Sequence, residues 1–328
     1  MLRFAVIGTN KITDKFIEAA KLCKGFELIA VYSRTKERAV QFASKHKAVL
    51  VYDDLEELAA SKEVDAVYVA SPNSLHAEQS IKMLRGKKHV LCEKTIASNK
   101  KELEAMLKAA KDNGVILLEA MRSVFDPGFK TIAANMSKLG TIRRVTFQYC
   151  QYSSRYDNFK QGIIENAFNP VFSNGALMDI GVYCIHPLLK LFGMPKKIWS
   201  SAVILENGID GAGTIMVNYE DMLGELIYSK ITNSRLPSQI QGENGCMIIK
   251  EISDTREITI IYNDGQKEDI LISKHDNNMY YEAEEFIRLI QTKSNAQEHN
   301  QYSLMQLSIM DEVRNQTGIS FPADFTKK

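Results

Sequence analysis

Ionisable side chains interrupt two otherwise apolar runs of this sequence. Residues 89–95 contain Glu93 and Lys94, and residues 175–183 contain Asp179 and Tyr183. Burying such groups is costly unless they are paired or used in chemistry. Asp179 and Tyr183 are four residues apart, so a helix places them on one face. The pattern indicates a site for proton transfer and charge stabilisation, although a tyrosine in a core helix is more often structural.

The elements that would position these residues begin with a regular alternation over the first 120 residues. Short apolar runs predict strands at 4–7, 26–32, 50–52, 64–70, 89–92 and 115–118. A helical pattern with apolar positions Phe16, Ala19, Ala20 and Cys23 follows the first strand, and further helical patterns fill the intervals at 36–45, 54–61, 76–85 and 99–113. This alternation predicts parallel strands joined by crossover helices.

The pattern changes after about residue 122. Strand runs are expected at 142–149, 198–205, 213–219, 224–232, 239–242, 246–251, 257–262 and 267–272, with a hairpin turn at 263–265. Helices are expected at 175–192, 280–291 and 301–316, and residues 151–174 are expected to be rich in loops. The fold class is therefore α/β, with a first domain over 1–121 and a second over 122–328. The second is expected to be an α+β domain whose large, mostly antiparallel sheet carries helices on one face.

Residues 7–13 follow the first strand and open the first helix, which is the context of a dinucleotide-binding fingerprint. Gly8 supplies the tight turn, while Asn10 and Thr13 stand where the second and third glycines are usual. Asparagine tolerates left-handed backbone, and a helix N-terminus offers N–H groups to a pyrophosphate. A plain strand-to-helix turn is an equal alternative. The candidate cofactor contacts here are Gly8, Thr9, Asn10, Lys11 and Ile12.

The ends of the second and fourth strands supply further candidates. Ser33 and Arg34 stand where an acidic residue usually holds the ribose of NAD. An arginine can pair with a 2′-phosphate, so NADP(H) is favoured over NAD(H); the alternative is a solvated arginine. Ser71, Pro72, Asn73 and His76 form a turn at the ligand-binding edge of the sheet. His76 is equally compatible with packing or with bonding to backbone.

With these segments in view, the chain resembles the Gfo/Idh/MocA oxidoreductase family, which includes glucose–fructose oxidoreductase and inositol dehydrogenase. The segments that carry the resemblance are Ile7-Gly8-Thr9, Ser71-Pro72-Asn73 with His76, Glu93-Lys94, Glu119-Ala120-Met121 and Asp179-Ile180-Gly181-Val182-Tyr183. The chain is also similar to the dimeric dihydrodiol dehydrogenase branch. The resemblance implies a Rossmann domain followed by an open-sheet domain that forms a homodimer or homotetramer. It also implies NAD(P)-linked transfer of a hydride to or from a sugar, polyol or related alcohol/carbonyl substrate.

The resemblance also implies residue roles. Lys94 would bond the substrate oxygen and stabilise its charge, and Tyr183 would transfer the proton. Asp179 would orient Lys94 or bind a substrate hydroxyl, and Glu93 joins Lys94 among the cofactor contacts. Gly181 would allow a close approach of backbone or cofactor. Thr95 replaces the usual proline after the lysine, and Tyr183 replaces the histidine of inositol dehydrogenases, which argues against that simple assignment.

Two alternatives to a dehydrogenase remain open. The incomplete fingerprint suits a non-catalytic NAD(P)-binding sensor or partner protein, and the fold class also suits a methyltransferase, which Ser33 and Arg34 disfavour. Substrate contacts are expected among Arg122, Arg155, Tyr156, Asn166 and Asn169, and His186 is interpreted as a helix-end residue before Pro187.

Composition argues against several other classes of protein. The net charge is +1, and Lys and Arg are dispersed, so neither a nucleic-acid nor a membrane partner is expected. The five cysteines show no C-x-x-C spacing, so no metal site is expected and a reducing compartment is favoured. No secretory signal and no membrane-spanning run is recognised, so the cytoplasm is the expected location.

Overall fold

The chain folds into two compact units in a computed structural model that describes residues 1–325. The first unit contains Met1–Met121 and His275–Leu304, and the second contains Arg122–Lys274 and the later residues from Met305. The segment 275–304, expected in the second domain, therefore belongs to the first unit. Residues 326–328 of the expected second domain lie outside the described residues.

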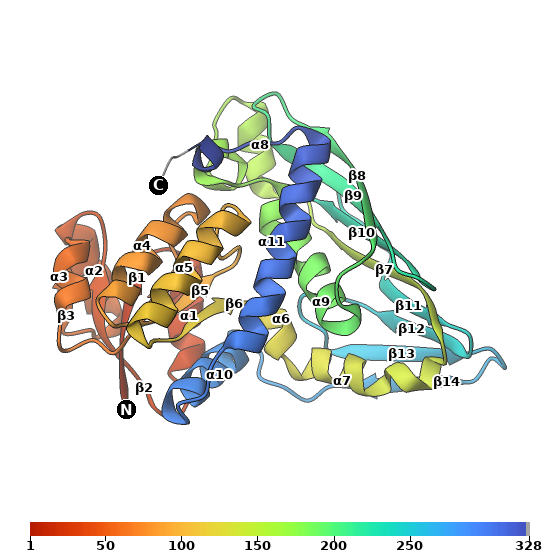
Figure 1. Cartoon of the computed structure of the whole chain (residues 1–328), viewed down its shortest axis with the longest axis horizontal. Coiled ribbons are helices and arrows are strands. Elements are labelled where there is room, and N and C mark those ends of the chain that lie inside the picture. The colour runs from red at the N-terminus through yellow and green to blue at the C-terminus, as the bar shows by residue number, and fades with distance from the viewer. Residues whose placement is uncertain (326–328) are drawn as a thin grey trace. The chain divides into compact units, whose positions relative to one another are not determined.

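The first unit contains a six-stranded parallel sheet with the order β3-β2-β1-β4-β5-β6 (Figure 1). Its strands are β1 (Leu2–Ile7), β2 (Phe26–Tyr32), β3 (Leu50–Tyr52), β4 (Ala66–Val69), β5 (His89–Glu93) and β6 (Leu117–Ala120). Its helices are α1 (Lys11–Ala20), α2 (Lys36–His46), α3 (Leu55–Ala60), α4 (Asn73–Arg85), α5 (Lys100–Asn113) and α10 (Met279–Gln291). Helix α4 packs beside α5, and α1 packs beside α10. The strand order reverses between β1 and β4, the place where ligands bind in doubly wound sheets.

The second unit contains an eight-stranded sheet with the order β14-β13-β12-β11-β7-β10-β9-β8. Its strands are β7 (Ile142–Cys150), β8 (Lys197–Ile204), β9 (Asp210–Asn218), β10 (Leu223–Ser229), β11 (Ser238–Gly242), β12 (Gly245–Ile249), β13 (Glu257–Tyr262) and β14 (Lys267–Leu271). All neighbours are antiparallel except β7 and β10. Buried and exposed residues alternate along β9 and β12. The fold class expected from the sequence is confirmed, including the hairpin turn between β13 and β14.

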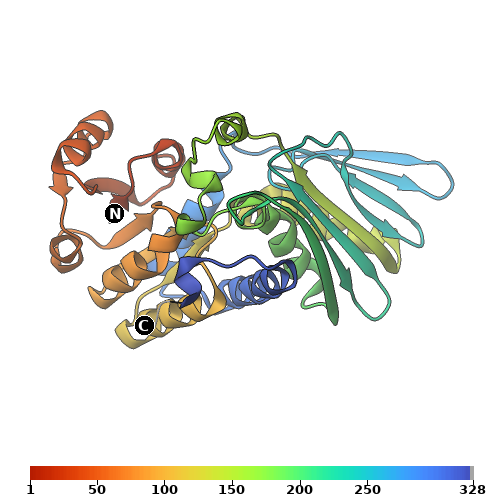
Figure 2. The same cartoon turned by 90° about the horizontal axis from the view of Figure 1, so that it is seen from above.

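Helices of the second unit gather on one face of this sheet, where α9 packs against β7 and β10 (Figure 2). They are α6 (Arg122–Phe125), α7 (Pro127–Asn135), α8 (Ser154–Lys160) and α9 (Val182–Phe192), with short turns η1 (Met136–Leu139), η2 (Asn166–Phe168), η3 (Pro170–Phe172), η4 (Leu177–Gly181) and η5 (Pro322–Phe325). Helix α11 (Gln297–Thr317) contains the boundary between the units. Helices α6, α7 and α8 were not expected from the sequence, and neither was the π-helical turn η4.

One helical segment within the described residues, 170–192, has the length and composition of a membrane span, which the sequence analysis did not recognise. Its mean hydropathy is 1.3, and 78% of its apolar window is buried in the structure. A buried core helix passes the same test, so this segment is weak support for a membrane association.

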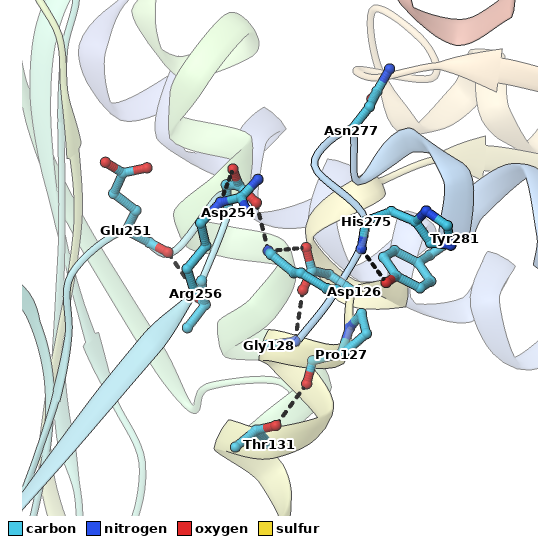
Figure 3. Close-up of polar contacts among 12 residues, drawn as sticks. Asp126, Pro127, Gly128, Thr131, Glu251, Asp254, Arg256, His275, Asn277 and Tyr281 are labelled. Carbon is cyan, nitrogen blue, oxygen red and sulfur yellow. Dashed lines mark hydrogen bonds and ion pairs between the residues drawn. The ribbon is translucent and has the colours of Figure 1, made fainter. Parts of the chain in front are cut away.

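A buried ion-pair cluster holds the start and the end of the second unit's first segment (Figure 3). Lys274 Nζ lies 2.6 Å from Asp126 Oδ2 and 2.5 Å from Asp254 Oδ1. The Lys274 side chain is 0% exposed and that of Asp126 is 1% exposed. Asp126 also caps α7 by accepting a hydrogen bond from the Gly128 N–H at 2.6 Å. The cluster therefore ties α7 to the chain beyond β14 through charges that have little access to water.

Candidate functional site

The turn between β1 and α1 lies close to the backbone that follows β4, at the reversal point of the first sheet. Gly8 has φ +109°, and a Cβ there would lie 2.6 Å from the Ala70 carbonyl oxygen, so only glycine fits. Asn10 donates from Nδ2 to the same oxygen at 2.8 Å. The turn residues Thr9, Lys11 and Ile12 retain exposed surface. These features fit the pyrophosphate of a dinucleotide.

The structure corrects the expected role of Asn10. Its φ of −108° is extended rather than left-handed, and its side chain is the N-cap of α1. Asn10 Oδ1 accepts hydrogen bonds from the N–H groups of Ile12 and Thr13 at 3.0 and 3.2 Å. Two N–H groups expected to be free for an anion therefore already have a partner, because an N-cap side chain satisfies the first turn of a helix.

The end of β2 presents an exposed cation beside this turn. Ser33 is buried, and its N–H donates to the Tyr52 carbonyl at 3.2 Å. Arg34 is exposed and makes no hydrogen bond or ion pair with any other described residue. Since β2 is hydrogen-bonded to β1, Arg34 follows the strand next to the Gly8 turn. An exposed arginine in this place fits a 2′-phosphate.

His76 does not face an open site. It is 1% exposed, and its ring nitrogens lie within hydrogen-bond distance of two backbone carbonyl oxygens, Nε2 2.8 Å from that of Ser71 and Nδ1 2.9 Å from that of Thr95. A neutral ring donates to one of the two. Burial lowers the pKa of His76 to about 4, although the two carbonyl contacts act in the opposite direction. The expectation that His76 contacts the cofactor is therefore replaced by its alternative, bonding to backbone. Asn73 opens α4 in the same turn, after Pro72.

Lys94 is the one partly exposed residue in the buried stretch 91–98. Its neighbour Glu93 accepts a hydrogen bond from Tyr68 Oη, whose pKa is raised by burial and by the charge of Glu93. On the other side, the Ile96 N–H donates to Glu119 Oε1 at 3.0 Å. The Lys94–Thr95 peptide bond is cis. The backbone on both sides of Lys94 is thus held by buried side chains, while the lysine itself reaches the surface of its unit.

Asp179 is paired with a cation that the sequence analysis missed. Lys230 Nζ lies 2.6 Å from Asp179 Oδ2 and donates to the Ala167 carbonyl at 3.1 Å. The Lys230 side chain is 4% exposed and that of Asp179 is 31% exposed. Within the second unit, Asp179 is thus oriented by Lys230, and its expected roles, orienting Lys94 or binding a substrate hydroxyl, stay predictions. The available signal was a lysine directly after the apolar run of β10, the same pattern that drew attention to Lys94.

Tyr183 lies in the first turn of α9 and is 5% exposed. Arg122 Nε donates to Tyr183 Oη at 3.2 Å, and its guanidinium carbon lies 5.4 Å from the centre of the tyrosine ring. The ring of Tyr149 meets that of Tyr183 edge to face at 5.7 Å. Arg122, which was expected to contact the substrate, therefore donates a hydrogen bond to the phenol oxygen of Tyr183.

Two expectations for this helix are wrong. Helix α9 continues through Pro187 to Phe192, so His186 does not end it; His186 is 3% exposed and bonds Gln306 Oε1 at 2.6 Å. Gly181 does not admit a backbone or a cofactor. A Cβ there would lie 3.2 Å from the Tyr228 ring, so this glycine makes room for a side chain of β10.

The remaining substrate candidates lie around a small aromatic cluster that also touches Lys230. Tyr156 stacks on Phe168 at 5.8 Å, and Lys230 Nζ lies 4.8 Å from the centre of the Phe168 ring. Arg155 pairs with Glu165 at 3.4 Å, while Asn169 caps η3 and Asn166 begins η2. Through Phe168 and Lys230, Tyr156 is connected by contacts to Asp179.

A parallel sheet with a glycine turn at its reversal point is typical of a dinucleotide-binding domain, the class to which oxidoreductases with a Rossmann fold belong. Comparison with known proteins agrees with this class. Residues 2–121 match the model of the oxidoreductase family with an NAD-binding Rossmann fold, and residues 132–248 match the Gfo/Idh/MocA C-terminal domain. The chain belongs to the Gfo/Idh/MocA oxidoreductase family, as the resemblance predicted.

Individual relatives align over nearly the whole chain. The scyllo-inositol 2-dehydrogenase (NADP(+)) of Bacillus subtilis is 50% identical over 326 residues, covering 99% of each chain. A trans-1,2-dihydrobenzene-1,2-diol dehydrogenase of Danio rerio is 27% identical, covering 98% of this chain and 99% of its own. The crystal structure of a 3-ketoreductase from Actinomadura kijaniata with NADP and TDP-benzene has a TM-score of 0.86 at 22% identity, covering 96% and 98%. The prediction of a nicotinamide-linked oxidoreductase acting on CH–OH groups is thus confirmed.

Proposed function

We propose that this protein is an NADP(H)-dependent dehydrogenase of a cyclic polyol, acting on a secondary hydroxyl of an inositol-like ring. The observation that carries the proposal is the Tyr183 phenol with Arg122 bonded to its oxygen, on the same helical segment as the paired Asp179. The relative that is 50% identical is named for an inositol substrate. We therefore keep an inositol-like substrate, although Tyr183 was expected to argue against a simple inositol dehydrogenase.

NADP⁺ supplies the acceptor for the hydride when it is bound. We assign the other steps to the residues of this chain. Tyr183 transfers the hydroxyl proton, and Arg122 donates a hydrogen bond to its phenol oxygen during that transfer. Lys94 donates a hydrogen bond to the substrate oxygen, and Asp179, held by Lys230, accepts one from a neighbouring ring hydroxyl. The products are the ketone, NADPH and one proton, so atoms and charge balance.

The cofactor contacts are assigned to the first unit. Gly8, Thr9, Asn10, Lys11 and Ile12 would hold the pyrophosphate, Ser33 and Arg34 the 2′-phosphate, and the segments 71–73 and 93–94 the nicotinamide half. We expect Arg34→Ser to raise the KM for NADP⁺ by about tenfold or more and to leave that for NAD⁺ nearly unchanged, because a charge-assisted pair contributes about 1.5–3 kcal/mol. A matched control is Arg85→Ser in the last turn of α4.

The chemistry is tested by initial rates with NADP⁺ on scyllo-inositol, myo-inositol and a panel of sugars and diols. Tyr183→Phe and Lys94→Ala should each lower kcat by about 10²-fold or more, the usual size of a general acid–base contribution. Tyr149→Phe is a matched control, because it removes a phenol hydroxyl from the ring beside Tyr183. Equal kcat in the wild type and both site variants would refute the assigned roles.

The alternative is a non-catalytic NADP(H)-binding sensor, and one observation favours it. The Asn10 side chain already occupies two N–H groups at the anion end of α1, which weakens that site. Tight NADPH binding with no turnover across the whole polyol panel would support the sensor over the dehydrogenase.

We further propose that the molecule is a cytoplasmic homo-oligomer, a dimer or tetramer, assembled through the face of the second sheet that α9 does not cover. Apolar side chains are exposed along its β8–β10 end, among them Trp199, Val203, Met216 and Leu223. Trp199 and Met216 are register partners on adjacent strands. The test is molar mass by light scattering, with Met216→Lys expected to yield the monomer. A monomeric wild type would refute the assembly.

A further inference from the structure

His76 is a buried side chain that joins two segments of the first unit. It lies in the first turn of α4, and its ring spans from the Ser71 carbonyl to the Thr95 carbonyl. Ser71 follows β4, and Thr95 follows β5, which is hydrogen-bonded to β4 along its length. Because His76 belongs to the helix that begins directly after the first of these turns, a hydrogen bond from Nδ1 to the Thr95 carbonyl connects the two turns at the carboxyl ends of neighbouring strands.

The contact on Thr95 is adjacent to Lys94. Thr95 directly follows Lys94 in the chain. The direction of the Thr95 carbonyl is therefore coupled to the backbone conformation of Lys94. Glu119 holds the next residue, Ile96, and is itself bonded by Ser303 Oγ at 2.6 Å. Tyr68 holds Glu93 on the preceding side. Of His76, Glu119 and Tyr68, it is His76 that also lies against the 71–73 turn, through the Ser71 carbonyl.

The chemistry of the ring sets the strength of this connection. A neutral imidazole has one N–H donor, whereas both acceptors here are carbonyl oxygens. A phenyl ring has nearly the same volume and can satisfy neither carbonyl. Because the variant loses a hydrogen bond between buried groups, the segment that carries the acceptor is expected to move.

We propose that His76 is a positioning residue for Lys94: it ties the turn after β4 to the turn after β5 and so fixes the backbone from which the lysine reaches the substrate oxygen. The inference rests on the proposed role of Lys94. It assigns His76 neither to the cofactor nor to the substrate.

A matched control is found at the other end of β5, the strand that precedes Lys94. His89 begins β5, and its Nδ1 accepts a hydrogen bond from the Ile116 N–H at 3.0 Å. His89→Phe removes one ring-to-backbone bond from the same strand without touching the Lys94 turn. His76→Phe and His89→Phe therefore separate a positioning role from a loss of general stability.

The experiment is a double-mutant cycle on kcat for polyol oxidation. His76→Phe should lower kcat by about 10–100-fold, the size expected for a misplacement of about 1 Å, with the Kd for NADPH changed by less than about threefold. In the Lys94→Ala background, His76→Phe should have no further effect, because residues acting as one unit are not additive. His89→Phe should leave kcat unchanged. An unchanged kcat in His76→Phe, or effects that multiply in the double variant, would overturn the proposal.

A second readout does not depend on turnover. The rate at which Lys94 is trinitrophenylated, measured by peptide mass spectrometry, should change in His76→Phe and not in His89→Phe. If the wild type turns over no polyol, the proposed function fails, and the labelling rate still decides the positioning of Lys94. Should His76→Phe not fold by circular dichroism, His76→Leu serves in its place, since it also lacks an N–H donor. Equal labelling in the wild type and the folded variant refutes the role of His76.

Discussion

The buried cluster around Lys274 allows a stability prediction to be worked from the structure. In Lys274→Met the Asp126 carboxylate, 1% exposed, loses its ammonium partner at 2.6 Å. Breaking a buried ion pair from one side costs about 3–5 kcal/mol, because the remaining charge stays buried after it has lost its partner. Asp254 is 25% exposed and can be hydrated, so we assign most of the loss to Asp126. The expected cost is a large share of the roughly 5–15 kcal/mol that stabilises a typical domain.

The matched control is a surface pair of the same length in the same unit. Lys138 Nζ lies 2.6 Å from Glu268 Oε1, but the two side chains are 36% and 38% exposed. Lys138→Met should cost only about 0–1 kcal/mol, because water solvates both charges. The distance to the carboxylate is thus the same in the Lys274–Asp126 and Lys138–Glu268 pairs, while their burial differs.

The assay is urea unfolding at fixed protein concentration, followed by the fluorescence of Trp199. This is the only tryptophan in the sequence, and it lies in β8 of the unit that contains Lys274. The midpoint should fall with little change in m. Adding Asp126→Asn should recover part of the loss, since no charge then remains to be buried and the amide oxygen can still accept from the Gly128 N–H. Equal costs for Lys274→Met and Lys138→Met would refute the reasoning.

Two further predictions concern Asp179 and the pH dependence of stability. Lys230→Met removes the cation 2.6 Å from Asp179 and should lower kcat/KM for the polyol about tenfold or more, with partial recovery in Lys230→Arg; an unchanged kcat/KM would argue against any role for Asp179. Burial by itself raises the pKa of Glu285, but hydrogen bonds from Arg288 and His299 outweigh it and lower the pKa to about 2. Since the folded pKa lies below the unfolded value near 4.3, this carboxylate stabilises the protein above about pH 4 and loses that effect as the pH falls toward 2. Glu285→Gln should therefore lower the melting temperature at pH 7 and differ less from the wild type at pH 3; a constant difference would contradict the linkage.

The sequence was sufficient for the elements whose signal is local. The first sheet was predicted because each strand is a short apolar run beside a helical pattern, and these periodicities do not depend on distant residues. The strands of the second sheet were predicted for the same reason, usually within three residues of their ends. Helices α6 and α7 were missed because Pro127 and Gly128, which read as a turn, begin α7 behind the Asp126 cap. The π-helical turn at η4 could not be predicted either, because apolar positions were compared with the α-helical period of 3.6 residues per turn.

For the candidate site, too, local features could be predicted and contacts between distant residues could not. The sequence by itself determined which acid–base groups stand in apolar runs, among them Lys94, Asp179 and Tyr183, because an ionisable group in such a run is costly wherever the chain folds. Only the tertiary structure decided their partners. Lys230 reaches Asp179 across 51 positions, and Arg122 reaches Tyr183 across 61. Such pairs are set by strand order and packing, which bring distant segments together, and no local spacing encodes them.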